Sequence, residues 1–112
     1  MILHNYLSNS GRDLIYEYIN SLPEAEKIDG YTVLQQREKG EFDKILFKRW
    51  EKKVYEVYFQ KNNRVFYITV DKENIYLLHS CRKQKNKTEK KDANIVRKRA
   101  KELGNMLGRK FI

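Results

Sequence analysis

The chain has 112 residues, of which 40% are hydrophobic and 35% charged, a balance that fits one folded domain and not a disordered segment. It contains no apolar run approaching the roughly 20 residues that cross a bilayer, and a single cysteine, Cys81. Its first residues show no basic segment followed by an apolar stretch, so we expect no signal peptide. These features argue against a membrane-spanning protein, a secreted protein and a disulfide scaffold, and we expect a cytoplasmic protein without a metal site.

The net charge of +9 is concentrated at the C-terminal end. Residues 1–81 carry 12 basic and 12 acidic side chains, whereas residues 82–112 carry 12 basic and 3 acidic ones. A neutral body with a cationic end is typical of a surface that contacts nucleic acid. An acidic protein partner and a merely solvated, Lys-rich helix are the alternatives.

The N-terminal part of the chain predicts one short strand and two helices. We expect the strand over residues 2–7 and the first helix over residues 12–22, where apolar side chains fall at helical spacing. Pro23 ends this helix and favours the start of a second one, which should run to Lys39 and stop at Gly40.

Two local features describe this second helix. Ser21 and Glu24 are spaced as a capping box, and Gly30 should weaken the helix interior. Its buried face is expected to be formed by Ala25, Ile28 and Leu34.

The C-terminal part predicts a three-stranded antiparallel meander and a last helix. Residues 54–59, 64–70 and 75–81 are rich in β-branched and aromatic side chains and are separated by turn-like segments. Residues 88–107 should form a helix capped by Thr88, with a narrow apolar stripe of Ala93, Val96, Ala100, Leu103 and Leu107. The order β-α-α-β-β-β-α predicts an α+β domain that spans residues 1–112.

The turn between the first two meander strands decides which way Arg64 points. A two-residue loop pairs Lys61 with Arg64 and places Arg64 on the face of Val57 and Phe59. A three-residue loop pairs Gln60 with Arg64 and places Arg64 beside Glu56 and Tyr58. Only the second creates a polar face that suits RNA; the residues alone leave the choice open, and a family resemblance of the whole chain, given next, favours the second.

The order of these segments resembles the RelE/ParE toxin superfamily, and in detail its phage-related HigB branch. The resemblance covers roughly residues 5 to 103 and rests on the motifs Ser10-Gly11-Arg12, Ser21-Leu22-Pro23, Lys48-Arg49-Trp50, Tyr55-Glu56-Val57-Tyr58, Arg64-Val65-Phe66-Tyr67 and Leu77-Leu78-His79-Ser80-Cys81, followed by the basic run 82–88. The chain departs from the family pattern at Tyr58, where the family has Arg, at Ser80-Cys81, where it has Gly-Phe, and at Glu89, where it has Pro.

The resemblance implies a RelE-like fold and the toxin of a type II toxin-antitoxin system. Such a toxin is a metal-independent, ribosome-dependent mRNA endoribonuclease, needs no cofactor, and forms a hetero-oligomer with a HigA-like helix-turn-helix antitoxin. ParE-type toxins share this fold but poison DNA gyrase without being enzymes, and a simple nucleic-acid-binding module is the third possibility.

Cleavage by the ribose 2′-OH requires a base, an acid and cations for the phosphate. We expect catalytic roles for Arg64, His79, Lys83 and Lys87, and RNA contacts from Lys48, Tyr58, Arg82, Lys85, Arg97 and Lys98. Each has a plainer alternative: a structural histidine, a packed tyrosine or a solvated lysine. Glu56 is either a base or the partner of Lys48 or Arg64. We also expect Arg64→Ala to abolish toxicity while leaving the fold intact.

Overall fold

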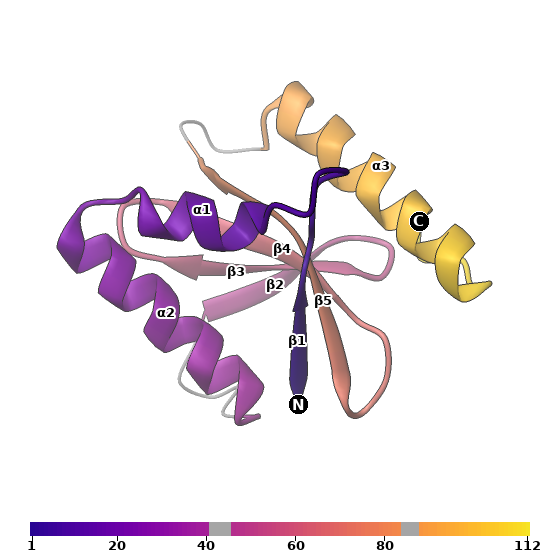
Figure 1. The fold of residues 1–112 in the computed structure, drawn as a ribbon, viewed down its shortest axis with the longest axis horizontal. Coiled ribbons are helices and arrows are strands. Elements are labelled where there is room, and N and C mark those ends of the chain that lie inside the picture. Colours follow the sequence, from indigo (N-terminus) through magenta and orange to yellow (C-terminus); the bar gives the residue numbers. More distant parts are fainter. Residues whose placement is uncertain (41–45, 84–87) are drawn as a thin grey trace.

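The computed structural model describes residues 1–40, 46–83 and 88–112 (Figure 1). Five strands form one sheet in the order β1-β5-β4-β3-β2. The elements are β1 (Ile2–Asn5), α1 (Leu14–Asn20), α2 (Glu24–Glu38), β2 (Leu46–Glu51), β3 (Val54–Phe59), β4 (Asn63–Thr69), β5 (Asn74–Arg82) and α3 (Lys90–Leu107). The α+β class and the two N-terminal helices and single C-terminal helix are thus confirmed.

The helices cover both faces of the sheet, as Figure 1 shows with α1 and α2 on one side and α3 on the other. One core lies under α1 and α2 and includes Ile15, Ile19, Val57, Val65 and Tyr67. The second lies under α3 and includes Val54, Phe66, Ile68, Val96 and Leu103. Strands β3 and β4 therefore send alternate side chains into different cores.

The sheet has one more strand than the sequence predicts and is not wholly antiparallel. β2 pairs antiparallel with β3 at one edge, and β1 pairs parallel with β5 at the other. The edge position of β2 explains why its sequence, LFKRWE, lacks the apolar alternation of a half-buried strand: four of its six residues are exposed. β1 ends at Asn5, two residues before the expected end.

Helix α2 follows its expected bounds but not its expected buried face. Leu34 is buried as predicted, whereas Ala25 and Ile28 are exposed. The predicted capping box is wrong, because the N-cap residue is Pro23 and the Ser21 hydroxyl donates backwards to the Tyr18 carbonyl. A Cβ at Gly30 would lie 2.9 Å from the Phe59 ring, so this glycine lets α2 approach β3 closely.

The hairpin between β3 and β4 has a three-residue loop, Gln60 to Asn62, and pairs Tyr58 with Arg64. The expected partner Gln60 is wrong by two positions. The side-chain parity is nevertheless as predicted, since Arg64 shares a face with Glu56 and Tyr58 and not with Val57.

The final helix α3 begins at Lys90, and its N-cap is Glu89 and not Thr88. The apolar stripe is confirmed: Ala93, Val96, Ala100 and Leu103 are buried, while Leu107 is half-buried. Among the described residues, we find no helix with both the length and the apolar character needed to cross a membrane.

Candidate functional site

A buried ion pair lies at the centre of the candidate site. Arg64 of β4 and Glu56 of β3 point to the same face of the sheet, and Arg64 Nη1 donates to Glu56 Oε1 over 2.5 Å. The two side chains are only 2% and 1% exposed. The expected alternative in which Glu56 is the partner of Arg64 is thus observed, and the Arg64 guanidinium neutralises a buried carboxylate.

Three further side chains gather around this pair. The Tyr58 ring centroid lies 4.8 Å from the Arg64 guanidinium carbon and 5.7 Å from the Lys48 ammonium. Lys48 comes from β2, where it pairs in register with Glu56, and its pKa is raised chiefly by the Tyr58 side chain. The structure thus brings together Lys48, Tyr58 and Arg64 from three adjacent strands.

Lys83 joins this group from the end of β5, and its backbone N–H donates to the Asn62 carbonyl of the hairpin loop. Partial burial, then the positive charges of Arg64 and Lys48, lower the pKa of the Lys83 ammonium. A lysine whose pKa is depressed has a larger neutral fraction near pH 7, and only the neutral amine can accept a proton. Together these residues, Lys48, Glu56, Tyr58, Arg64 and Lys83, are called the sheet cluster below.

His79 lies on the same sheet face but is held by helix α3. Its Nε2 is 2.8 Å from Asp92 Oδ1, and its Nδ1 is 3.4 Å from an Arg99 nitrogen. Since Arg99 can only donate, Nδ1 is an acceptor and Nε2 carries the proton toward Asp92. Burial lowers the pKa of His79, which favours this neutral form. The geometry supports a tether between sheet and helix.

The donor atoms of His79, Cys81 and Asp92 lie within 4.8 Å of one another, which raises the question of a metal site. Because Nδ1 of His79 accepts from Arg99, the proton of the ring lies on Nε2, the atom that faces Asp92. Burial also raises the pKa of Cys81 to about 12, so the thiol keeps its proton. The arrangement fits a hydrogen-bonded tether better than a set of metal ligands.

The remaining expected RNA contacts are dispersed. Arg82 faces away from the sheet cluster and pairs with Glu26 of α2 over 2.6 Å. Arg97 makes two 2.9 Å hydrogen bonds to Glu51 and lies over Trp50. Lys98 is exposed on α3, and Lys85 and Lys87 lie outside the described residues.

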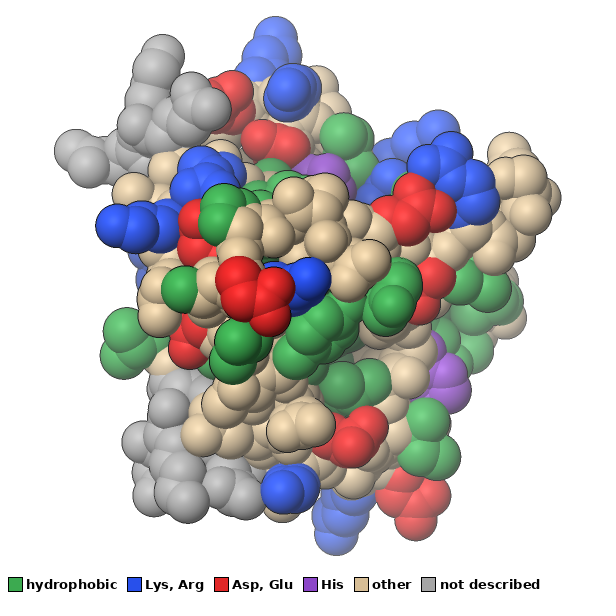
Figure 2. All heavy atoms as spheres, turned by 60° about the vertical axis from the view of Figure 1, so that its left-hand side comes forward, with side chains coloured by type: hydrophobic (Ala, Val, Ile, Leu, Met, Phe, Trp, Pro, Cys, Tyr) green, Lys and Arg blue, Asp and Glu red, His purple; other side chains and the backbone are tan. Residues whose placement is uncertain are grey.

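Charge on the side of the molecule that carries α1 and α2 is mixed in sign. Figure 2 shows acidic and basic side chains close together there, with hydrophobic side chains between them. Ion pairs such as Arg12–Glu17 and Lys27–Glu24 account for part of this pattern. The net positive charge therefore does not come from a uniformly basic surface on this side.

Asp92 and Arg99 are site residues that sequence reasoning missed. Both lie on α3 beside its apolar stripe, in the series Asp92, Val96, Arg99, Leu103. That spacing puts them on the face that packs against the sheet. A charged residue at the edge of a buried helical stripe indicates a partner on the surface against which the helix packs. Here Asp92 meets His79, and Arg99 donates to the Leu78 carbonyl.

Comparison with known proteins identifies one family. No curated protein matches the chain. A family model described as "Phage derived protein Gp49-like (DUF891)" matches residues 17–101, well over half of the chain and all of the sheet cluster. The chain therefore belongs to the Gp49-like family of phage-derived proteins, which are RelE-like and toxin-like.

Proposed function

We propose that this protein is the toxin of a type II toxin-antitoxin system, of the HigB-like branch, and that it cleaves mRNA on the ribosome. The observation that carries the proposal is the sheet cluster. Two lysines, a tyrosine and an arginine converge there from separate strands, around one carboxylate. Family membership supports the toxin-like character, and the cluster supports RNA chemistry.

The reaction is an in-line displacement at phosphorus. The Lys83 amine takes the proton of the 2′-OH, the bond from O2′ to phosphorus forms, and the bond from phosphorus to O5′ breaks. The leaving O5′ takes up a proton, for which Lys48 is the candidate donor. Lys83 suits the role of base because its pKa is lowered. The raised pKa of Lys48 keeps its ammonium charged, so Lys48 carries a proton and a positive charge beside the leaving oxygen.

Arg64 and Tyr58 have roles that follow from their burial. Arg64 holds Glu56 with one nitrogen, while its buried Nε finds no acceptor among the residues the structure describes. Because that nitrogen is buried, Arg64 acts through its charge, which lowers the pKa of Lys83 and adds positive potential beside the phosphate. Tyr58, which is half-buried above Arg64, offers its ring to an unstacked base.

Dependence on the ribosome follows from the small number of groups in the cluster. Three side chains carry the proposed proton transfers and charge stabilisation, and little surface remains to orient an RNA strand. A ribosome that holds the message in place would supply that orientation, which is worth a large part of a reaction barrier. Naked RNA should therefore be cut poorly.

Primer extension on messages from cells expressing the protein tests the proposal. We expect new 5′ ends within translated codons for the wild type and none for Lys83→Gln. Lys72→Gln, which changes an exposed lysine in the distant β4–β5 turn, is the matched control and should cut normally. Intact messages accompanied by chromosomal DNA damage would overturn the proposal in favour of a gyrase poison.

We further propose a HigA-like helix-turn-helix antitoxin as the physiological partner. A message-cutting enzyme would arrest its own host, so an inhibitor has to accompany it. Co-expression of the product of the neighbouring gene should restore growth, and the two proteins should co-purify as a hetero-oligomer. Growth arrest that persists during co-expression would contradict that pairing.

A further inference from the structure

A second basic surface lies on the opposite side of the sheet from the sheet cluster. It is an open cavity of about 560 Å³ beside β2, the β2–β3 turn and the C-terminal half of α2. Four cations line it, Arg37, Arg49, Lys52 and Lys53, together with the aromatic side chains of Phe47 and Tyr55. No carboxylate of the described residues lines it. We call it the edge pocket.

Strand register places the edge pocket and the sheet cluster on different faces. Along β2, Phe47 and Arg49 alternate with Lys48, which belongs to the sheet cluster. Arg49 pairs with Tyr55, and Tyr55 pairs with Tyr67 of the core beneath α1 and α2. One RNA nucleotide therefore cannot occupy both places at once, and the edge pocket is not an extension of the proposed active site.

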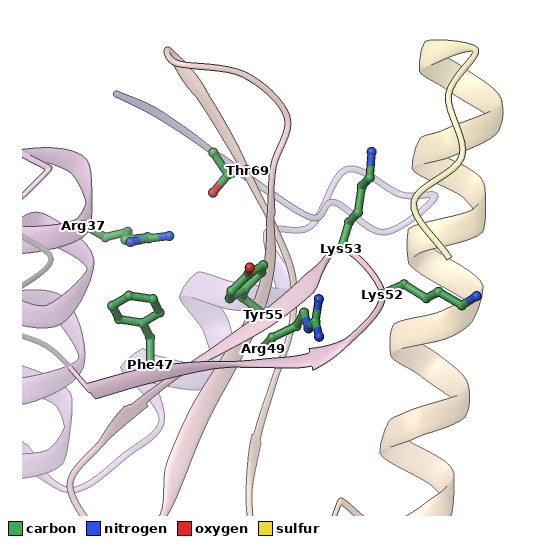
Figure 3. A pocket seen from close by; sticks show the side chains of 7 residues that line it. All are labelled: Arg37, Phe47, Arg49, Lys52, Lys53, Tyr55 and Thr69. Carbon is green, nitrogen blue, oxygen red and sulfur yellow. The ribbon is translucent and has the colours of Figure 1, made fainter.

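The inner wall of the edge pocket is built from packed side chains. Arg37 is only 6% exposed, and its guanidinium carbon lies 4.4 Å from the Tyr67 ring centroid and 5.2 Å from that of Phe47. Figure 3 shows Arg37 entering from α2 beside the ring of Phe47. Because Arg37 is already held in place by packing, it loses little conformational entropy when a ligand binds.

The outer wall of the edge pocket carries exposed cations and a partly exposed aromatic ring. Arg49 and Lys53 are exposed, and Phe47 is 41% exposed. The Lys53 backbone N–H donates to the Phe111 carbonyl, which ties the β2–β3 turn to the C-terminal segment. Lys52, by contrast, extends away from the cavity toward α3 in Figure 3. Arg49, Lys53 and Phe47 are therefore the groups that a ligand meets first.

We propose that the edge pocket is a second RNA-binding site, which holds a phosphate with Arg49 and Lys53 and stacks one unpaired base on Phe47. Cations beside an exposed ring are the combination by which proteins grip single-stranded RNA. An acidic protein segment would use the charge but would gain little from the ring. The proposal rests on the proposed function for its class of ligand, and it means that RNA contacts the protein from both sides of the sheet.

The test uses the full chain and a fluorescent 12-nucleotide single-stranded RNA whose 2′-O-methyl groups prevent cleavage. Binding is measured by anisotropy from 50 to 200 mM salt. We expect Arg49→Gln with Lys53→Gln to weaken binding and to lower the log-log salt slope by about 1.4, since each phosphate contact on a single strand contributes about 0.7. Phe47→Ala should weaken binding about 5- to 150-fold with a nearly unchanged slope.

Controls separate the edge pocket from the sheet cluster. Lys72→Gln removes an exposed lysine that lines neither site and should bind like the wild type. If messages are not cut in cells but the edge-pocket variants lose RNA affinity as expected, the proposed function fails and the edge pocket stands. Unchanged affinity and slope in these variants, or no RNA binding by the wild type, would overturn the edge pocket. The edge pocket would also be overturned as an RNA site if its variants kept their RNA affinity and lost only their affinity for an oligoglutamate probe, because that result would indicate an acidic protein ligand.

Discussion

Replacing Arg64 by Ala should destabilise the fold by about 3–5 kcal/mol, because it leaves the Glu56 carboxylate buried without a counter-charge. A domain of this size has about 5–15 kcal/mol of stability in total. At roughly 4 °C per kcal/mol, the melting temperature should fall by about 10–20 °C. Loss of toxicity in this variant would therefore not isolate a catalytic role, and the buried ion pair argues against the expectation that the fold stays intact.

Denaturant unfolding of a double-mutant cycle measures the effect. Glu56→Leu with Arg64→Met should recover most of the lost stability, since replacing both members of a buried pair by apolar residues is often neutral or better. The matched control is the exposed Arg97–Glu51 pair, whose members are 47% and 33% exposed. Arg97→Ala should cost about 1 kcal/mol or less.

Two results would refute the reasoning about this pair. The first is a loss below about 1 kcal/mol for Arg64→Ala, which would mean that Glu56 finds water or another partner. The second is strict additivity in the cycle, which would mean that the two side chains do not interact.

Three other predictions follow from the geometry. Burial lowers the pKa of His79 in the folded state, so the unfolded chain binds a proton at His79 at higher pH than the folded chain does. The free energy of unfolding should therefore decrease from pH 7 to pH 5, and it should decrease less in His79→Gln. Gly104→Ala should lower the melting temperature, because the new Cβ would lie 2.4 Å from the Arg109 carbonyl oxygen; an unchanged melting curve would contradict this close approach. Lys48→Gln should slow cleavage, because it removes the proposed proton donor. It should also move the acidic limb of the pH-rate profile to higher pH, because Lys48 helps to lower the pKa of Lys83; a shift of that limb to lower pH would exclude Lys83 as the base.

The sequence predicted the elements whose apolar pattern is strong. Strand β3 was placed at its observed bounds, and the stripe of α3 faces the sheet as expected. Strand β2 was missed because an edge strand needs no apolar alternation, and the pairing of β1 with β5 was missed because parallel contacts join segments 72 residues apart. Local spacing cannot report such long-range pairing.

The sequence predicted which residues of the hairpin share a face of the sheet, but not most of the ion pairs that they and other residues make. Side-chain parity correctly grouped Tyr58 and Arg64, since a strand fixes which residues share a face. The Glu56–Arg64 ion pair was one of the expected alternatives, because neighbouring strands bring the two residues together. The partners of Arg82 and Arg97 were not predictable, because Glu26 and Glu51 meet them only after distant segments pack together. Sequence reasoning therefore counted as free several cations that the fold neutralises.

Cleavage of a message by the purified protein, with and without purified ribosomes that are translating it, tests the central claim most directly. We predict cuts within the codon at the decoding site only when ribosomes are present, and their loss in Lys83→Gln but not in Lys72→Gln. Equal cutting of the naked message would contradict ribosome dependence, and an intact message in both reactions would contradict the endoribonuclease itself.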